Sequence, residues 1–307
     1  MERALTVLLT LPQILWGILL SIYYGLETVY RWVNPQAFEK SIKNDIILVT
    51  GAGSGIGRLM ALKLAKLGAI IVSWNVNSAS NKETIQLIKA QGGVAYAYTV
   101  DLCKKEAIYE AAAKTKQEVG VVKILVNNAG IVSGTPLLET PDEKIIRTYD
   151  VNVLAHFWTI KAFLPDMIEN KSGHIVTIAS LAGHGGTPRL VDYCSSKFAA
   201  VGIDDTLKVE LVALGHDEYI KTTVVCPYCI STGMFAGFKS KIIPILEPEF
   251  VVSEAVKGII TNKPQVILPW WCAILICLKT VVPLKGWMYL CKVLGLNCCM
   301  DEFEGRQ

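Results

Sequence analysis

The sequence of 307 residues has little of what marks several large classes of protein. It has no basic tract and a formal net charge of only +3, so we do not expect a nucleic-acid partner. It has no internal repeat or low-complexity linker, so we expect the main part of the chain to form one domain. Its few histidines lack metal-ligand spacing, which predicts no metal site. They are His156, His174, His184 and His216.

Cysteine is present without the pattern of a disulfide scaffold. Nine cysteines, an odd number, are scattered without framework spacing. This distribution fits a reducing compartment, so we expect the thiols to be free.

The N-terminal segment lacks charge. Leu5 to Leu26 carries no formal charge, and at about 1.5 Å per residue it is long enough to cross a hydrocarbon layer of roughly 30 Å. Aromatic side chains follow toward its far end, as at a membrane interface. We interpret residues 1–40 as an uncleaved membrane anchor, because the start has no positive excess and no Ala-x-Ala site closes the run. A hairpin in one leaflet, helped by Pro12 and Gly17, stays open.

Positive charge predicts which side of the membrane the rest of the chain faces. Arg31, Lys40 and Lys43 follow the apolar run, whereas only Arg3 and the chain amine precede it. This bias places the main domain in the cytosol, in agreement with free cysteines. Glycosylation of the single sequon at Asn170 would overturn this assignment.

Strand-like apolar runs alternate with helical stretches from Ile46 onward. Such alternation predicts an α/β fold of the Rossmann type, a single doubly wound parallel sheet with helices on both faces, over residues 41–268. The runs are Ile46–Val49, Ile70–Trp74, Val94–Val100, Ile124–Val126, His174–Ala179, Lys221–Val225 and Gln265–Leu268.

A glycine turn follows the first of these runs. Such a turn between a strand and a helix lets the backbone approach a phosphate closely, and the anion then meets the free N–H groups of the helix start. The flanking strand and helix favour a dinucleotide site over a purely structural turn. The candidate contacts are Gly51, Ser54, Gly55, Ile56 and Gly57.

A hydroxyl, a phenol and an ammonium group form the candidate catalytic set. Ser180 follows the fifth run, at the strand end where open α/β sheets bind ligands. Tyr193 and Lys197 stand one helical turn apart and share a helix face. A phenol with a pKa near 10 is a poor base at pH 7, and a nearby cation favours the phenolate. Tyr193 is therefore the predicted general acid/base, Ser180 orients the substrate oxygen, and Lys197 lowers the pKa of the phenol.

Together these motifs resemble the short-chain dehydrogenase/reductase family across about Ile46 to Gly233. The resemblance implies an NAD(P)-dependent alcohol dehydrogenase in which Lys197 also holds the nicotinamide ribose. It implies further that Asp101 contacts adenine, Asn128 borders the cofactor, Asn152 supports a water relay to the lysine, and Thr232 contacts the carboxamide. By themselves, Asp101 and Asn152 are more typical of a helix cap or a kink, and Asn128 could simply tie adjacent strands together.

Cofactor choice depends on Asn75, eighteen residues after Gly57. An acidic residue at about this distance grips the ribose 2′-hydroxyl of NAD. Asn75 can still hydrogen-bond a hydroxyl, but it lacks the charge that would repel a 2′-phosphate. Arg58 and Lys82 are the nearest candidates to receive such a phosphate. We favour NAD, with NADP as the alternative.

A narrower resemblance connects the chain to the epidermal retinol dehydrogenase and microsomal 17-beta-hydroxysteroid dehydrogenase branch. It rests on the N-terminal apolar segment and on local runs such as Asn128–Val132, Lys161–Pro165 and Asp192–Ala200. It implies a lipophilic alcohol, such as retinol, a hydroxysteroid or a fatty alcohol, at the endoplasmic reticulum membrane or lipid droplets. Asn75 departs from the acidic residue usual in the family, and Pro227-Tyr228 departs from its Pro-Gly.

Cys226 and Cys229 also match a glutaredoxin-like Cys-x-x-Cys motif. The family places its Pro-x-x-Ile-x-Thr segment at this point, so we do not expect dithiol chemistry here.

The last third of the chain carries two apolar segments. Residues 233–250 stand where the family has its substrate lid, although a loop that covers the core is also consistent. Residues 269–307 suit a membrane-surface element with snorkelling lysines, a helix packed on the domain, or a homodimer contact. The alternative to an enzyme is a catalytically idle family member that acts as a scaffold at the endoplasmic reticulum or lipid droplet.

Overall fold

The computed structural model describes residues 2–305 and leaves out the side chains of residues 2–9 and Trp32. Part of the anchor prediction rests on Met1 and on the side chains of Arg3, Leu5 and Trp32, which lie outside the part of the chain that the structure describes. The chain forms two compact units, Met1–Ser41 and Ile42–Gln307.

The first unit is one long helix and a short turn. Helix α1 spans Glu2–Val33 and is followed by a 3-10 turn at Pro35–Phe38. The Arg31 guanidinium lies 4.1 Å from the centre of the Phe38 ring and pairs with Glu27 at 2.7 Å. None of the helices, over the part of the chain that the structure describes, has the length and apolarity to cross a bilayer. The predicted membrane span is therefore unconfirmed.

The second unit is built on a seven-stranded sheet in the order β3-β2-β1-β4-β5-β6-β7, with every neighbouring pair parallel. The predicted doubly wound α/β fold is confirmed. Each predicted run is a strand whose ends differ from the prediction by no more than two residues. The strands are β1 Ile46–Thr50, β2 Ile70–Asn75, β3 Val94–Thr99, β4 Ile124–Asn127, β5 Gly173–Ile178, β6 Ile220–Pro227 and β7 Gln265–Leu268.

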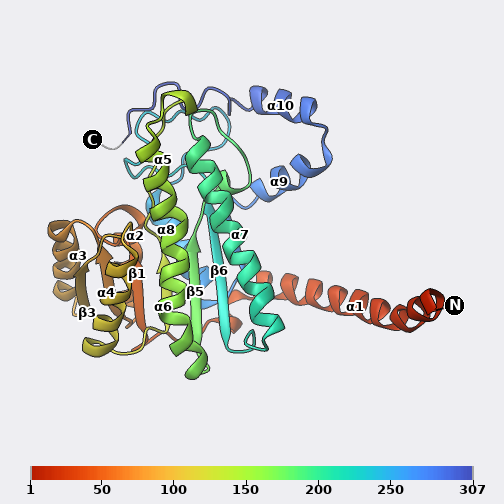
Figure 1. Ribbon diagram of the computed structural model, residues 1–307, viewed down its shortest axis with the longest axis horizontal. Helices are drawn as coiled ribbons and strands as arrows, with labels where there is room; N and C mark the ends of the chain where they lie inside the picture. The colour runs from red at the N-terminus through yellow and green to blue at the C-terminus, as the bar shows by residue number, and fades with distance from the viewer. Residues whose placement is uncertain (1, 306–307) are drawn as a thin grey trace. The chain divides into compact units, whose positions relative to one another are not determined.

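Helices cover both faces of the sheet, because its central strands are apolar on both sides (Figure 1). One apolar cluster joins the sheet to α2, α3 and α8, and a second joins it to α4, α6 and α7. The helices are α2 Gly55–Lys66, α3 Ser78–Ala90, α4 Lys105–Glu118, α5 Asp142–Tyr149, α6 Ala155–Glu169, α7 Val191–Ala213, α8 Pro248–Ile260, α9 Cys272–Val281 and α10 Leu284–Val293.

Helices α9 and α10 lie beyond the end of the sheet at which α7 begins (Figure 1). This is the edge where the parallel strands have their carboxyl ends, and therefore where a doubly wound sheet binds its ligands. The C-terminal part of the chain thus covers the predicted site.

Candidate active site

The glycine turn closes directly after β1. Gly51 has a φ of +68°, which favours glycine, and a Cβ on it would lie 2.9 Å from the Ala129 Cα atom. A Cβ on Gly57 would lie 2.4 Å from the Gly51 carbonyl oxygen. A side chain at Gly51 would push the turn away from the loop after β4, and one at Gly57 would push α2 away from the turn, so the close approach needs glycine at both positions.

The end of β4 is tied to this turn through Asn128. Its side-chain amide donates to the Thr50 carbonyl at 2.8 Å, and its backbone N–H donates to the Thr50 hydroxyl at 2.9 Å. The Asn128 Oδ1 atom is buried and has no hydrogen-bond partner among the described residues. Asn128 therefore joins two strands and also leaves a polar acceptor for a bound ligand.

A cavity of about 370 Å³ opens at this edge of the sheet. The absence of Cβ atoms in the turn, the buried Asn128 acceptor and the first turn of α2 all fit a dinucleotide here. Every predicted cofactor residue lines it. They are Gly51, Ser54, Gly55, Ile56, Gly57, Asn75, Asp101, Asn128, Tyr193, Lys197 and Thr232.

Asp101 and Thr232 have identifiable local contacts. The Asp101 carboxylate accepts from the Cys103 N–H at 3.1 Å, whereas the N-cap of α4 is Lys104, so Asp101 shapes the loop before the helix. Thr232 lies beside the glycine turn, because a Cβ on Gly55 would be 3.7 Å from the Thr232 Cβ atom. The two residues therefore lie in the wall of the same cavity on different loops.

Ser180 and Tyr193 meet at the carboxyl end of β5. The Ser180 hydroxyl accepts from the Ala182 N–H at 3.1 Å and donates to the Pro227 carbonyl at 3.3 Å, which fixes its position. Tyr193 is 5% exposed, and the Ser180 hydroxyl lies next to its phenol. Burial raises the pKa of Tyr193, and the neighbouring Ser180 hydroxyl only partly opposes this rise.

Lys197 lies on the same face of α7 as Tyr193. Its ammonium group is 5.7 Å from the centre of the Tyr193 ring and donates to the Ile178 carbonyl at 2.9 Å. Burial lowers the pKa of Lys197 to about 8. The sequence predicts that the lysine lowers the pKa of the phenol. In the structure the largest effect on the pKa of Tyr193 is burial, which raises it.

Asn152 lies in a π-helical turn, Asp150–Leu154, between α5 and α6. Its side chain accepts from the Ile131 N–H at 2.9 Å and donates to the Ile131 carbonyl at 3.0 Å. A Cβ on Gly130 would lie 3.5 Å from both Asn152 Oδ1 and Lys197 Nζ, so these two groups flank one point. Asn152 is buried behind the cavity wall and does not line it. Such π-turns are frequent at functional sites.

The structure adds an apolar wall that the sequence did not connect with the catalytic set. The Phe235 ring meets the Tyr193 ring edge to face at 5.4 Å, and Phe303 lies behind Phe235 at 6.2 Å. Trp287 of α10 lines the same cavity. No sequence signal could identify Phe303, because it lies far along the chain from Tyr193.

Lys279 of α9 also joins this end of the cavity. Its ammonium donates to the His184 carbonyl at 2.6 Å and lies 4.9 Å from the centre of the Phe198 ring. The sequence allows either snorkelling lysines or a helix packed on the domain for this segment, and Lys279 bonds the loop that follows Ser180. Helix α9 is thereby attached to the catalytic loop.

The Cys226 and Cys229 thiols are both poor candidates for redox chemistry. Burial raises the pKa of each thiol to about 12, so neither is a thiolate near neutral pH. Cys226 is fully buried in β6 with its sulfur 3.5 Å from His184 Nε2.

Comparisons with known proteins agree with this geometry. The sequence model of the family described as short chain dehydrogenase matches residues 45–242. Human epidermal retinol dehydrogenase 2 is 44% identical over 287 residues, which cover 92% of each chain. Mouse estradiol 17-beta-dehydrogenase 11 is 44% identical over 283 residues, again 92% of each chain.

A solved structure has the same fold. It is a short chain dehydrogenase/reductase from Burkholderia phymatum in complex with NAD, with a TM-score of 0.72 and 23% sequence identity. The similarity covers 78% of this chain and 94% of that chain.

Proposed function

This chain belongs to the short-chain dehydrogenase family, and from that premise we propose that it transfers hydride between NAD or NADP and a lipophilic alcohol or its carbonyl. It is an oxidoreductase related to retinol and 17-beta-hydroxysteroid dehydrogenases. The proposal concerns the substrate, the roles of individual residues and the cellular location.

One observation carries the proposal: a single cavity joins the glycine turn, the Ser180–Tyr193 pair and an apolar wall. Its volume of about 370 Å³ lies within the range of small-molecule sites. An alcohol next to Tyr193 would therefore lie between the nucleotide side and the apolar side of one space.

The nucleotide would be held by the glycine turn and by the residues at the ends of β2, β3 and β4. Its phosphates would meet the N–H groups of Gly55, Ile56 and Gly57 at the start of α2. When bound, NAD or NADP supplies the acceptor or donor of the hydride.

Proton transfer is the task proposed for Tyr193. Its burial keeps the phenol protonated near neutral pH, which suits the donation of a proton to a carbonyl oxygen. Ser180 would hold that oxygen, since its hydroxyl is fixed beside the phenol. In the oxidation direction Tyr193 would first have to lose its own proton, and its phenolate would then receive the alcohol proton.

Lys197 is proposed to hold the nicotinamide ribose and to supply positive charge beside the phenol. With a pKa of about 8, its ammonium is mostly charged at pH 7. Asn152 is proposed to hold a water that connects Lys197 to solvent, because its side chain and Lys197 flank the same point at Gly130. This part of the proposal extends the family resemblance to the residues of this chain.

The substrate class follows from the wall opposite the nucleotide side. Phe235, Phe238 and Trp287 together with aliphatic side chains form it, and such a surface favours a large apolar molecule. The names of the two relatives refer to retinol and estradiol. We propose a retinoid or a hydroxysteroid as the substrate, and a fatty alcohol as a further candidate.

Membrane association is proposed from helix α1. Large apolar side chains such as Leu15, Trp16, Leu19 and Tyr23 are more than half exposed on it. A lipid environment would cover them, as at the endoplasmic reticulum or a lipid droplet, with the second unit in the cytosol. Exposed Phe198 and Val209 on α7 are consistent with a homodimer contact.

Turnover of the full-length protein in detergent or lipid tests the proposal. Retinol, estradiol and a fatty alcohol are each supplied with NAD and with NADP, and nicotinamide absorbance is followed. We expect turnover with at least one lipophilic alcohol and its loss in Tyr193→Phe. The scaffold alternative is supported if no alcohol or carbonyl gives turnover and Tyr193→Phe leaves the cellular phenotype intact.

A further inference from the structure

The amide of Asn75 is held in one orientation at the end of β2. Its Nδ2 atom donates to the Asn77 carbonyl at 2.9 Å and to the Ser80 hydroxyl at 3.1 Å. A backbone carbonyl can only accept, so the NH₂ group must face Asn77. Asn75 lines the cavity, and its Oδ1 atom is left as the acceptor for a ribose hydroxyl.

A carboxylate at position 75 would not fit this loop. An Asp there would direct an oxygen at the Asn77 carbonyl, so two acceptors would meet without a hydrogen between them. The loop is therefore built for a neutral amide. Repulsion of a 2′-phosphate by a charge at position 75 is not available to this chain.

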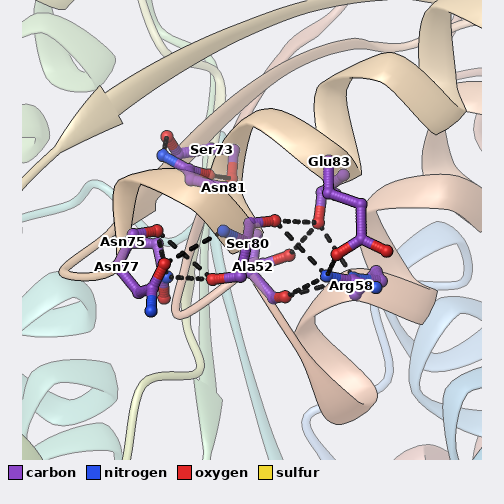
Figure 2. A network of polar contacts seen from close by, with 10 residues as sticks. Ala52, Arg58, Ser73, Asn75, Asn77, Ser80, Asn81 and Glu83 are labelled. Atoms are coloured by element: carbon purple, nitrogen blue, oxygen red, sulfur yellow. Dashed lines mark hydrogen bonds and ion pairs between the residues drawn. The ribbon is translucent and has the colours of Figure 1, made fainter.

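Arg58 lies on the other side of Ser80 from Asn75 (Figure 2). Its Nε atom donates to the Gly53 carbonyl at 3.1 Å and to the Thr84 hydroxyl at 3.0 Å. Its Nη2 atom donates to the Gly53 carbonyl at 2.6 Å and to the Ser80 carbonyl at 3.4 Å. The guanidinium thus fastens α2 and α3 to the glycine turn.

Glu83 neutralises the charge of Arg58. Its Oε2 atom lies 2.6 Å from Arg58 Nη2, and the two side chains are 58% and 22% exposed. Arg58 does not line the cavity, and neither does Lys82, which is exposed on α3. The guanidinium is therefore paired with a carboxylate and directed at backbone carbonyls rather than toward Asn75.

We infer that Glu83 determines the cofactor preference of this chain by holding Arg58 away from the ribose side of Asn75, so that NAD binds in preference to NADP. The ribose 2′-hydroxyl would donate a hydrogen bond to the uncharged Asn75 Oδ1. A 2′-phosphate would find Arg58 already paired with Glu83. This inference rests on the proposed dinucleotide function.

Direct binding tests the inference. NADH and NADPH are titrated by their own fluorescence into the full-length wild-type protein, Glu83→Gln, Arg58→Met/Glu83→Gln and the matched control Glu110→Gln. Glu110 is exposed on α4 and has no part in the network. All four proteins are first checked for the same thermal transition.

We expect the wild type to bind NADH about fivefold more tightly than NADPH. Glu83→Gln should tighten NADPH about fivefold and leave NADH within twofold, because an exposed ion pair is worth up to about 1 kcal/mol. The double variant should lose this gain, and Glu110→Gln should match the wild type. The gain should shrink at high salt, as a charge effect does.

Three results would overturn the inference. They are equal wild-type affinity for both nucleotides, an equal change of both affinities in Glu83→Gln, and a gain for NADPH that persists when Arg58 is removed. Arg58 also bonds the Gly53 carbonyl, so the double variant could lose the binding of both nucleotides. In that case the salt dependence of Glu83→Gln decides: tighter NADPH binding that does not weaken at high salt would reject the inference. A folded wild type that binds neither nucleotide would reject the proposed function itself.

Discussion

The two ends of the cavity are built differently. At the end near Asn75, the side chains of Asn75, Arg58 and Asn77 are bonded to the backbone of the chain itself. At the end near Ser180, Tyr193 and Lys197 are buried with pKa values shifted away from their ordinary values. The first end is fixed in shape, which suits recognition, and the second holds ionisable groups at an energetic disadvantage, which suits chemistry.

The largest expected effect is at the reaction end. Tyr193→Phe removes the proton donor and should lower kcat/KM about 10²-fold to 10⁴-fold, while the variant still binds NADH. Tyr96→Phe, on the exposed side of β3, is the matched control and should leave kcat/KM unchanged. If Tyr193→Phe keeps kcat/KM within threefold of the wild type, the end near Ser180 is not where proton transfer takes place.

The next largest effect is expected in the pH dependence of kcat/KM, which should follow the titration of Lys197. Its pKa is lowered to about 8, so its positive charge is present below that pH and is lost as the pH rises through it. For carbonyl reduction we expect kcat/KM to be level up to about pH 8 and then to fall about tenfold per unit. Burial lowers the pKa of nearby His156 to about 3, so it stays neutral in this range.

Lys197→Arg sharpens this test because a guanidinium keeps its charge. Its kcat/KM is expected to be lower at every pH, with the alkaline fall moved upward. If the fall stays near pH 8 in Lys197→Arg, another group controls it.

A stability change tests whether the C-terminal segment is part of the reaction end. A Cβ on Gly134 would lie 1.9 Å from the Phe303 ring, and Gly134 has a φ of +71°. Gly134→Ala should lower the free energy of unfolding by about 1–3 kcal/mol in chemical denaturation. Gly215→Ala is the control, because Gly215 has a similar φ of +69° and nothing lies within 4 Å of its added Cβ. Equal stability of the two variants would show that Phe303 does not pack there.

The smallest expected effect is at the adenosine end. The Asn77 side chain caps α3 by accepting from the Ser80 N–H at 3.0 Å. Asn77→Ala should lower the free energy of unfolding by about 1 kcal/mol and leave turnover unchanged, because the carbonyl that holds Asn75 belongs to the backbone. Thermal unfolding and kcat at saturating cofactor check both points. If Asn77→Ala lowered kcat about as much as Tyr193→Phe, the two ends of the cavity would not have separate roles.

The sheet could be predicted from the sequence because its strands are short branched apolar runs between helical stretches. Ile124–Val126 and Gln265–Leu268, for example, are strands within one residue of the prediction. The glycine turn was also predictable, because a Cβ at Gly51 or Gly57 would clash with neighbouring atoms. Patterns with a local cause were therefore sufficient for the fold.

The rest of the site depends on contacts between distant residues. No periodicity could place Phe303 and Trp287 around the space beside Tyr193. The pairing of Arg58 with Glu83 spans two helices, so the sequence left Arg58 as a candidate phosphate ligand. Burial of Tyr193, which raises its pKa, likewise results from tertiary packing.

The most direct test of the central claim follows the hydride itself. Full-length protein is given NAD and a retinoid or steroid alcohol that carries deuterium on its carbinol carbon, and the nucleotide is examined by mass spectrometry. The account predicts deuterated NADH in an amount equal to the carbonyl formed, and almost none with Tyr193→Phe. A protein that binds NAD but leaves it free of deuterium with every such alcohol would contradict the account.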